Sequence, residues 1–284
     1  MNKKALLITA GSVVVVAILG YLFLVPHFQV NAYANTVGEK QTKMNEALNK
    51  VGAILTRDTF VNTDVPPATV ASDVKIGNEA IANAESVLQN SKSDLITFNT
   101  LPLLSVVNGR YKAAESLKAD EQNYIAKYEA FLTEMKSVLA YQDKTSDIST
   151  KFSDFVTITS DAMLNAESPE EYSTKIDKGI ATLQPSIDAF ATLTPPASLK
   201  DDHDYMLKAF NDLVALYKQS SAAATSGNMD LYVDTLNKIS EKYDEIQKKS
   251  DDFNAEFVRN SELQKLNAGL LDIDRKIIQK QASL

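Results

Sequence analysis

The sequence predicts an all-α protein in which a single N-terminal transmembrane helix precedes an elongated up-and-down helical bundle that could consist of two related bundles. Three observations support this fold class. The segment Ala5–Val25 is apolar and uncharged, and apolar residues recur after it at intervals of three and four. Helix breakers are scarce, with 9 glycines and 8 prolines in 284 residues. The abundance of alanine, lysine, glutamate and leucine favours helices over strands.

The first element is the predicted transmembrane helix. An uncharged run of this length spans the ~30 Å hydrocarbon core of a bilayer. Lys3 and Lys4 precede the run, whereas the first charge after it is Glu39. By the positive-inside rule, we expect the N-terminus in the cytoplasm and the C-terminal domain outside a single-pass cell membrane, which we interpret as bacterial. The alternative is a signal peptide cleaved near Ala34, which would produce a secreted protein.

We expect four segments along the chain. A loop at Thr63-Asp64-Val65-Pro66-Pro67 and a polar break at Asp143–Ser149 mark boundaries between segments. The segments are a cytoplasmic tip and signal anchor at 1–28, a helical stalk at 29–62, a first bundle portion at 63–145 and a second bundle portion at 146–284.

Local helix signals are clear in the second bundle portion. Ser168-Pro169-Glu170-Glu171 combines a capping serine, a proline suited to the first turn and a glutamate at the third helical position. Gly227 is suited to ending a helix and Asn228 to starting the next. Ser261 could cap a separate terminal helix. We expect Pro185 either to kink or to divide the helix that contains it.

Two short segments resemble each other. The sequence Phe98-Asn99-Thr100-Leu101-Pro102 is similar to Phe190-Ala191-Thr192-Leu193-Thr194-Pro195, and each is expected between two helices. This similarity predicts two related helical hairpins, although five matching residues could also arise by chance.

Composition excludes several functions. The net charge of −8 disfavours nucleic acid as a partner, because an acidic domain repels phosphates. The chain has no cysteine, so it can form neither a disulfide nor a thiolate metal site. A lipoprotein anchor, which requires a cysteine, is excluded as well. The N-terminal helix is therefore the attachment that we expect.

Few residues suggest chemistry. His203 and Asp202 are metal-ligating types, but adjacent helical positions point in different directions, so we expect a buried histidine with one hydrogen bond rather than a metal site. The sequence contains no Glu-x-x-His pair and no phosphate-binding loop. We therefore predict no enzyme activity, no catalytic residue and no cofactor. Tyr111, Tyr172 and Tyr205 lie off the clearest apolar stripes and are candidates for a ligand-facing surface.

The segment Thr194-Pro195-Pro196-Ala197-Ser198-Leu199, followed by His203-Asp204, Leu207, Phe210 and Leu213, resembles a pattern of uncharacterised exported helical proteins of bacteria. The resemblance implies a helical surface domain and no catalytic residue. The layout also resembles the LemA family, which has a short cytoplasmic tip, a membrane helix and a helical bundle. The arginine-rich and Asp-Leu-Ile-Pro-Asn-Leu segments of that family are absent from this chain.

These observations lead to two functional expectations. The first is a non-enzymatic cell-envelope protein that binds or scaffolds another envelope protein or a wall polymer through its helical faces. The second is a solute-sensing or ligand-binding bundle with a pocket between helices.

Overall fold

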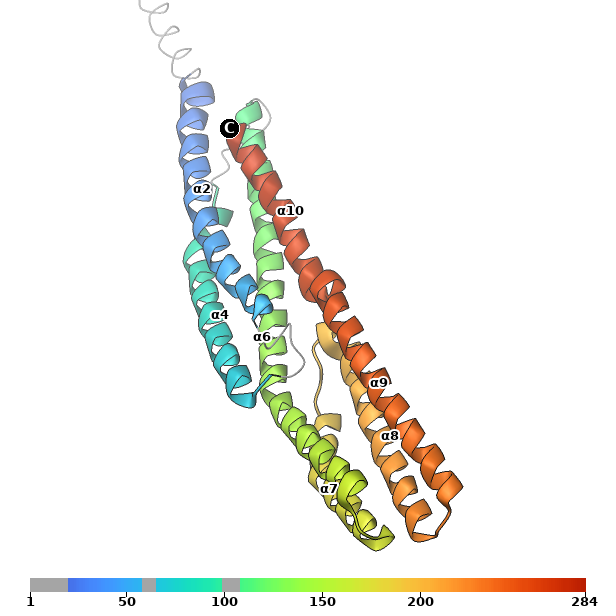
Figure 1. Ribbon diagram of the computed structural model, residues 1–284. Coiled ribbons are helices and arrows are strands. Elements are labelled where there is room, and N and C mark those ends of the chain that lie inside the picture. The colour runs from blue at the N-terminus through green and yellow to red at the C-terminus, as the bar shows by residue number, and fades with distance from the viewer. Residues whose placement is uncertain (1–19, 58–64, 99–107) are drawn as a thin grey trace, which may run out of the picture. The chain divides into compact units, whose positions relative to one another are not determined.

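The computed structural model describes residues 20–57, 65–98 and 108–284, apart from the side chains of Phe23, Pro67 and residues 254–260 (Figure 1). Within these ranges all regular secondary structure is helical, which confirms the predicted all-α class. Most of the expected membrane segment Ala5–Val25 lies outside the described residues. Among the residues that are described, no helix is both long and apolar enough to cross a membrane.

Seven α-helices form the described structure, with a short π-helical turn at Gly20–Leu24 and 3₁₀ turns at Ala53–Thr56 and Ala197–Leu199. The α-helices are α2 (Val25–Gly52), α4 (Pro67–Ile96), α6 (Gly109–Asn165), α7 (Pro169–Ala191), α8 (Lys200–Thr225), α9 (Met229–Asn260) and α10 (Glu262–Ala282).

The predicted break at Asp143–Ser149 is wrong, because α6 continues through it without interruption. After its first residue this helix contains neither glycine nor proline. Polar residues alone do not end a helix when their hydroxyls can bond to carbonyls of the preceding turn. Ser146 Oγ and Thr150 Oγ1 do so, to the carbonyls of Asp143 and Ser146. Pro185 likewise lies inside α7 and does not divide it.

The predicted helix boundaries in the later part of the chain are confirmed. Ser168 Oγ accepts a hydrogen bond from Glu171 N at the start of α7. Gly227 has a positive φ of 73°, and the side chain of Asn228 accepts from Leu231 N at the start of α9. Ser261 separates α9 from α10, and its hydroxyl accepts from Gln264 N at 3.2 Å. Each boundary follows from local hydrogen bonding that the sequence specifies.

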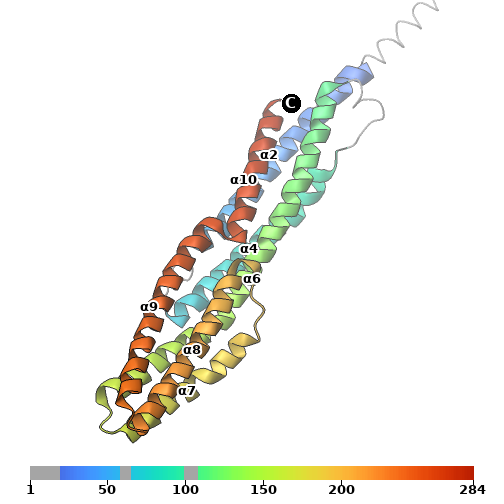
Figure 2. The same ribbon diagram turned by 90° about the vertical axis from the view of Figure 1, so that its right-hand side faces the viewer.

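The chain forms two compact units that interleave along the sequence. Unit 1 contains the described parts of Met1–Val51, Ala80–Leu132 and Leu266–Leu284, and unit 2 contains those of Gly52–Glu79 and Thr133–Lys265. This division differs from the consecutive portions that the sequence predicts, since the C-terminal helix belongs with the first helices. Within unit 2, α8 packs against both α7 and α9, and the three helices run up and down (Figure 2).

Each unit contains a cluster of three rings at corresponding places. In unit 1, Phe98 lies 4.9 Å from Tyr33 and 4.8 Å from Tyr111 between ring centres. In unit 2, Phe190 lies 6.3 Å from Tyr141 and 4.3 Å from His203. Tyr111 follows Phe98 by the same thirteen residues that separate His203 from Phe190. The phenylalanine that begins each of the two similar segments is therefore packed against two other rings.

Candidate functional site

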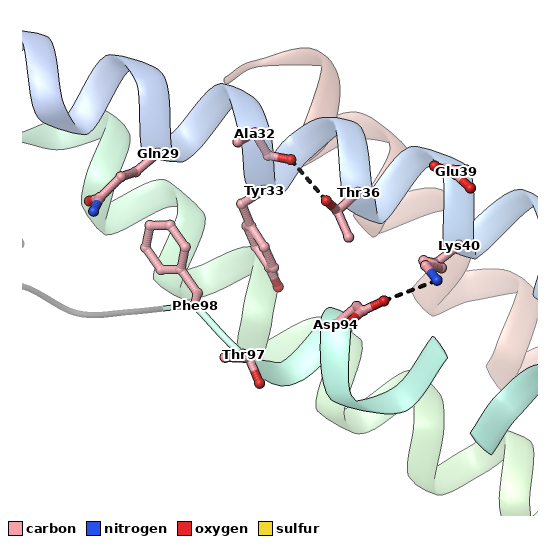
Figure 3. A pocket seen from close by; sticks show the side chains of 9 residues that line it. All are labelled: Gln29, Ala32, Tyr33, Thr36, Glu39, Lys40, Asp94, Thr97 and Phe98. Atoms are coloured by element: carbon pink, nitrogen blue, oxygen red, sulfur yellow. Dashed lines mark hydrogen bonds and ion pairs between the residues drawn. The ribbon is translucent and has the colours of Figure 1, made fainter. Parts of the chain in front are cut away.

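An open groove runs along unit 1 between α2 and the C-terminal end of α4, with a volume of about 590 Å³ (Figure 3). Its position follows from α2 and α4 packing through Tyr33, whose hydroxyl donates to the carbonyl of Leu95 at 2.6 Å. The lining residues are Gln29, Ala32, Tyr33, Thr36, Glu39 and Lys40 from α2, with Asp94, Thr97 and Phe98 from the other side.

The groove combines an aromatic base with charged edges. The rings of Tyr33 and Phe98 are buried, with 6% of each residue exposed, so neither offers an open stacking face. Lys40 Nζ lies 3.0 Å from Asp94 Oδ2 across the groove (Figure 3). Exposed Glu39 pairs with Lys43 at 2.7 Å. These groups can bind a polar or charged partner through ion pairs and hydrogen bonds.

A partly buried polar layer joins α2, α6 and α10 in the same unit. Asp274 Oδ1 accepts hydrogen bonds from Gln41 Nε2 and Asn45 Nδ2, each at 2.8 Å. Tyr124 Oη donates to Asn45 Oδ1 at 2.6 Å, and Tyr128 Oη donates to the carbonyl of Met44 at 3.2 Å. This network fixes the register of the three helices, because each bond requires one particular alignment.

Glu121 lies in this region, and sequence reasoning did not identify it. The residue has no exposed surface, and neither carboxylate oxygen has a hydrogen-bond partner. Burial, followed by the nearby charges of Asp274 and Asp120, raises the pKa of Glu121 to about 8. A signal was present in the sequence, since Glu121 stands at helical spacing between the apolar residues Leu117 and Ile125.

His203 is buried in unit 2, as expected of a core histidine with one hydrogen bond. Its Nδ1 lies 2.7 Å from Tyr141 Oη, and burial lowers the pKa of the ring. Burial raises the pKa of the neighbouring Asp202 to about 6. Within the described ranges, no cluster of three histidine or carboxylate side chains could hold a metal ion. Tyr141 already occupies Nδ1, which leaves only Nε2 of His203 for any ligand.

The three tyrosines expected to face a ligand have different surroundings. Tyr111 is fully buried against Phe98, and Tyr172 is buried with its hydroxyl 2.7 Å from Ser220 Oγ. Neither ring is exposed, because both take part in helix packing. Tyr205 is partly exposed on α8, with Lys249 Nζ 6.0 Å from its ring centre.

Two groups of exposed apolar side chains stand out in the described residues. Near the start of α2, Tyr21, Leu24 and Phe28 follow one another at spacings of three and four, and Phe28 is 70% exposed. The second group, which we term the end patch, belongs to the last turn of α6 and the first turns of α9. Figures 1 and 2 draw these two helix ends at the same end of unit 2. Its members are Met163 (38% exposed), Leu164 (81%), Met229 (58%) and Val233 (52%).

Contacts within unit 2 join the helix ends near the end patch. Tyr172 and Tyr232 rings from the first turns of α7 and α9 meet edge to face at 5.4 Å. Lys175 Nζ lies 2.9 Å from Asp161 Oδ2, which ties the end of α6 to α7. The exposed carboxylates of Glu167, Glu170 and Asp230 lie on the same turns. The patch therefore presents apolar side chains among acidic groups.

Comparison with known proteins finds no similarity: no family model, no curated protein and no solved structure matches this chain. Its function is therefore interpreted from its own residues.

Proposed function

We propose that this chain is a non-enzymatic, membrane-anchored binding or scaffold protein of the bacterial cell envelope, with its helical units outside the cytoplasm. The observation that most supports binding is the end patch of unit 2. Apolar side chains gathered at one end of a helical unit are typical of interaction surfaces, whereas single exposed apolar residues are not informative.

The proposed anchor is the uncharged segment Ala5–Val25, with Lys3 and Lys4 on its cytoplasmic side. Tyr21 and Phe28 support this assignment, since aromatic side chains are favoured at membrane–water interfaces. Both side chains are exposed, together with Leu24 on the same helical face. The alternative is cleavage near Ala34, which would remove the first part of α2 together with the anchor and leave the rest of the chain as a secreted protein.

The partner that best fits the end patch is another envelope protein with a basic and apolar surface. Leu164 and Met229 would pack against apolar side chains of the partner, and the carboxylates of Glu167, Glu170 and Asp230 would attract its lysines or arginines. A wall polymer is a weaker fit, because sugar chains offer fewer apolar groups for Leu164.

Site-specific photocrosslinking in intact cells tests this proposal. A photoreactive residue at Leu164 or Val233 is expected to capture one envelope protein, whereas the same residue at Ile278, which is exposed on α10, captures none. The double variant Leu164→Asp, Met229→Asp should abolish capture without loss of helical circular dichroism. Equal capture from all three positions, or none from the patch, would contradict binding through the end patch.

A second candidate function is solute binding in the groove of unit 1. The groove volume of about 590 Å³ lies in the range of small-ligand sites, and Lys40, Asp94 and Glu39 could select a zwitterionic solute. In a thermal-shift screen, at least one metabolite is expected to raise the melting temperature of the wild-type chain but not that of Lys40→Ala. The absence of any stabilising metabolite would eliminate this alternative.

A further inference from the structure

The buried carboxylate of Glu121 has no role in the binding surface proposed above. Its two oxygens and Gln41 Oε1 are three buried acceptor atoms without a hydrogen-bond donor. An ionised carboxylate in this position is costly, since burial removes its hydration and nothing replaces it. The surroundings of Glu121 therefore determine what could satisfy these acceptors.

The helix register places Glu121 within one residue of the level of Gln41. Hydrogen bonds from Arg110 to Asn31 and from Tyr124 to Asn45 each join positions on α6 and α2 that are 79 residues apart. The same offset from Glu121 falls on the exposed Thr42, and the preceding residue of α2 is the buried Gln41. Gln41 already donates through Nε2 to Asp274, so its remaining oxygen can only accept a hydrogen bond.

The nearby charges that act on Glu121 are both negative. Asp274 on α10 and Asp120 on α6 are acidic, and Lys280 is paired with Asp120. The titratable groups that remain are the hydroxyls of Tyr33 on α2 and of Tyr124 and Tyr128 on α6, and burial raises the pKa of all three. The buried side chains that α4 contributes to unit 1 are uncharged: Ile81, Ala84, Leu88, Ser91 and Leu95.

Unit 2 provides an internal comparison for this position. Glu121 follows Phe98 by 23 residues, and Leu213 follows Phe190 by the same 23. Leu213 is also fully buried. An apolar side chain thus packs at the corresponding place in unit 2, so packing by itself does not require an acid.

We propose that Glu121 is a proton-binding site: its carboxyl group is held as a neutral acid inside unit 1, and its O–H donates a hydrogen bond to Gln41 Oε1. One proton is taken from water when α2 and α10 close on α6, and it is returned to water when the layer opens. The carboxylate gains one proton and becomes a neutral carboxylic acid, so the step conserves charge. Protonation supplies the missing donor and removes the repulsion from Asp274 and Asp120.

The direction of the resulting pH dependence follows from proton linkage. The pKa of Glu121 rises from an ordinary 4.5 to about 8 in the folded state. Between these values the folded chain binds a proton that the unfolded chain has released. Glu121 therefore favours the folded state most at acidic pH. This contribution is lost as the pH rises from 4.5 to about 8.

Infrared spectroscopy of the full chain in detergent tests the protonation state directly. At neutral pH the wild-type protein is expected to show the carbonyl band of a protonated carboxylic acid. The band should disappear in Glu121→Gln and persist in Glu46→Gln, which alters an exposed glutamate of α2. A wild-type spectrum without this band, or an identical band in Glu121→Gln, would overturn the proposal.

Urea unfolding, monitored by hydrogen exchange in α2 and α10, tests how protonation of Glu121 affects stability. From about pH 5 to about pH 9, the wild-type and Glu46→Gln midpoints should fall more steeply than that of Glu121→Gln. Equal slopes in all three proteins would contradict the coupling. A midpoint that depends on sodium or potassium at constant ionic strength, and only when Glu121 is present, would overturn the proton assignment in favour of a bound cation.

Discussion

Tyr141 and His203 form a buried pair in unit 2, with 2.7 Å between Tyr141 Oη and His203 Nδ1 and 5.8 Å between their ring centres. Replacing Tyr141 with phenylalanine retains the ring but leaves Nδ1 of His203 without a partner. We expect the free energy of unfolding to fall by about 1–3 kcal/mol, the cost of an unsatisfied buried polar group. Urea unfolding followed by circular dichroism measures this change, and an unchanged midpoint would contradict the role of the hydrogen bond.

The same histidine predicts a loss of stability in acid. Burial lowers the pKa of His203 below its ordinary 6.5, so the unfolded chain binds the proton first as the pH falls. The contribution of His203 is therefore present above about pH 6.5 and is lost below it. In His203→Gln, hydrogen exchange in α8 should depend less on pH in this range than in His27→Gln, which alters the other histidine of the chain. Equal pH dependence in both variants would contradict the assignment.

The start of α7 depends on Ser168. Its hydroxyl accepts from Glu171 N at 3.1 Å, and Ser168→Ala should lower the free energy of unfolding by about 1 kcal/mol. Ser168→Asp retains an acceptor at the same position and should stay close to the wild type. The opposite ranking of the two variants would show that this cap does not stabilise the helix.

Gly77 allows close packing between α4 and α6 in unit 2. A Cβ atom at Gly77 would lie 2.5 Å from Leu139 Cδ1, whereas a Cβ atom at Gly52, also in unit 2, meets nothing within 4 Å. We expect Gly77→Ala to destabilise the protein by about 1–3 kcal/mol, because overpacking outweighs the gain in helix propensity. Gly52→Ala should be neutral or stabilising. A stabilised Gly77→Ala would show that Leu139 moves aside at little cost.

Local features were predictable from the sequence, and long-range ones were not. The boundaries at Ser168, Asn228 and Ser261 depend on neighbouring residues, so they could be predicted from those residues alone. The prediction of a break at Asp143–Ser149 was wrong, because Thr145 and Ile148 are buried and support a continuous helix. The interleaved units could not be predicted, since apolar periodicity identifies the buried face of a helix but not its partner.

The candidate sites show the same limit. His203 was correctly expected to be a core residue, because its place on an apolar stripe is a local property. The groove depends on the approach of Lys40 and Asp94, which are far apart in sequence. Glu121 was missed because a single acid on a helix is usually solvated, and only the packing of α2 and α10 shows that it is buried.

In the proposed topology, the helical units lie outside the cytoplasm behind an N-terminal anchor. The chain has no cysteine, so Ile278→Cys introduces a single thiol at an exposed position of α10. We predict that a membrane-impermeant maleimide labels this thiol in intact cells, and that Asn2→Cys, on the expected cytoplasmic side, is labelled only after lysis. Labelling of Ile278→Cys only after lysis would contradict the account.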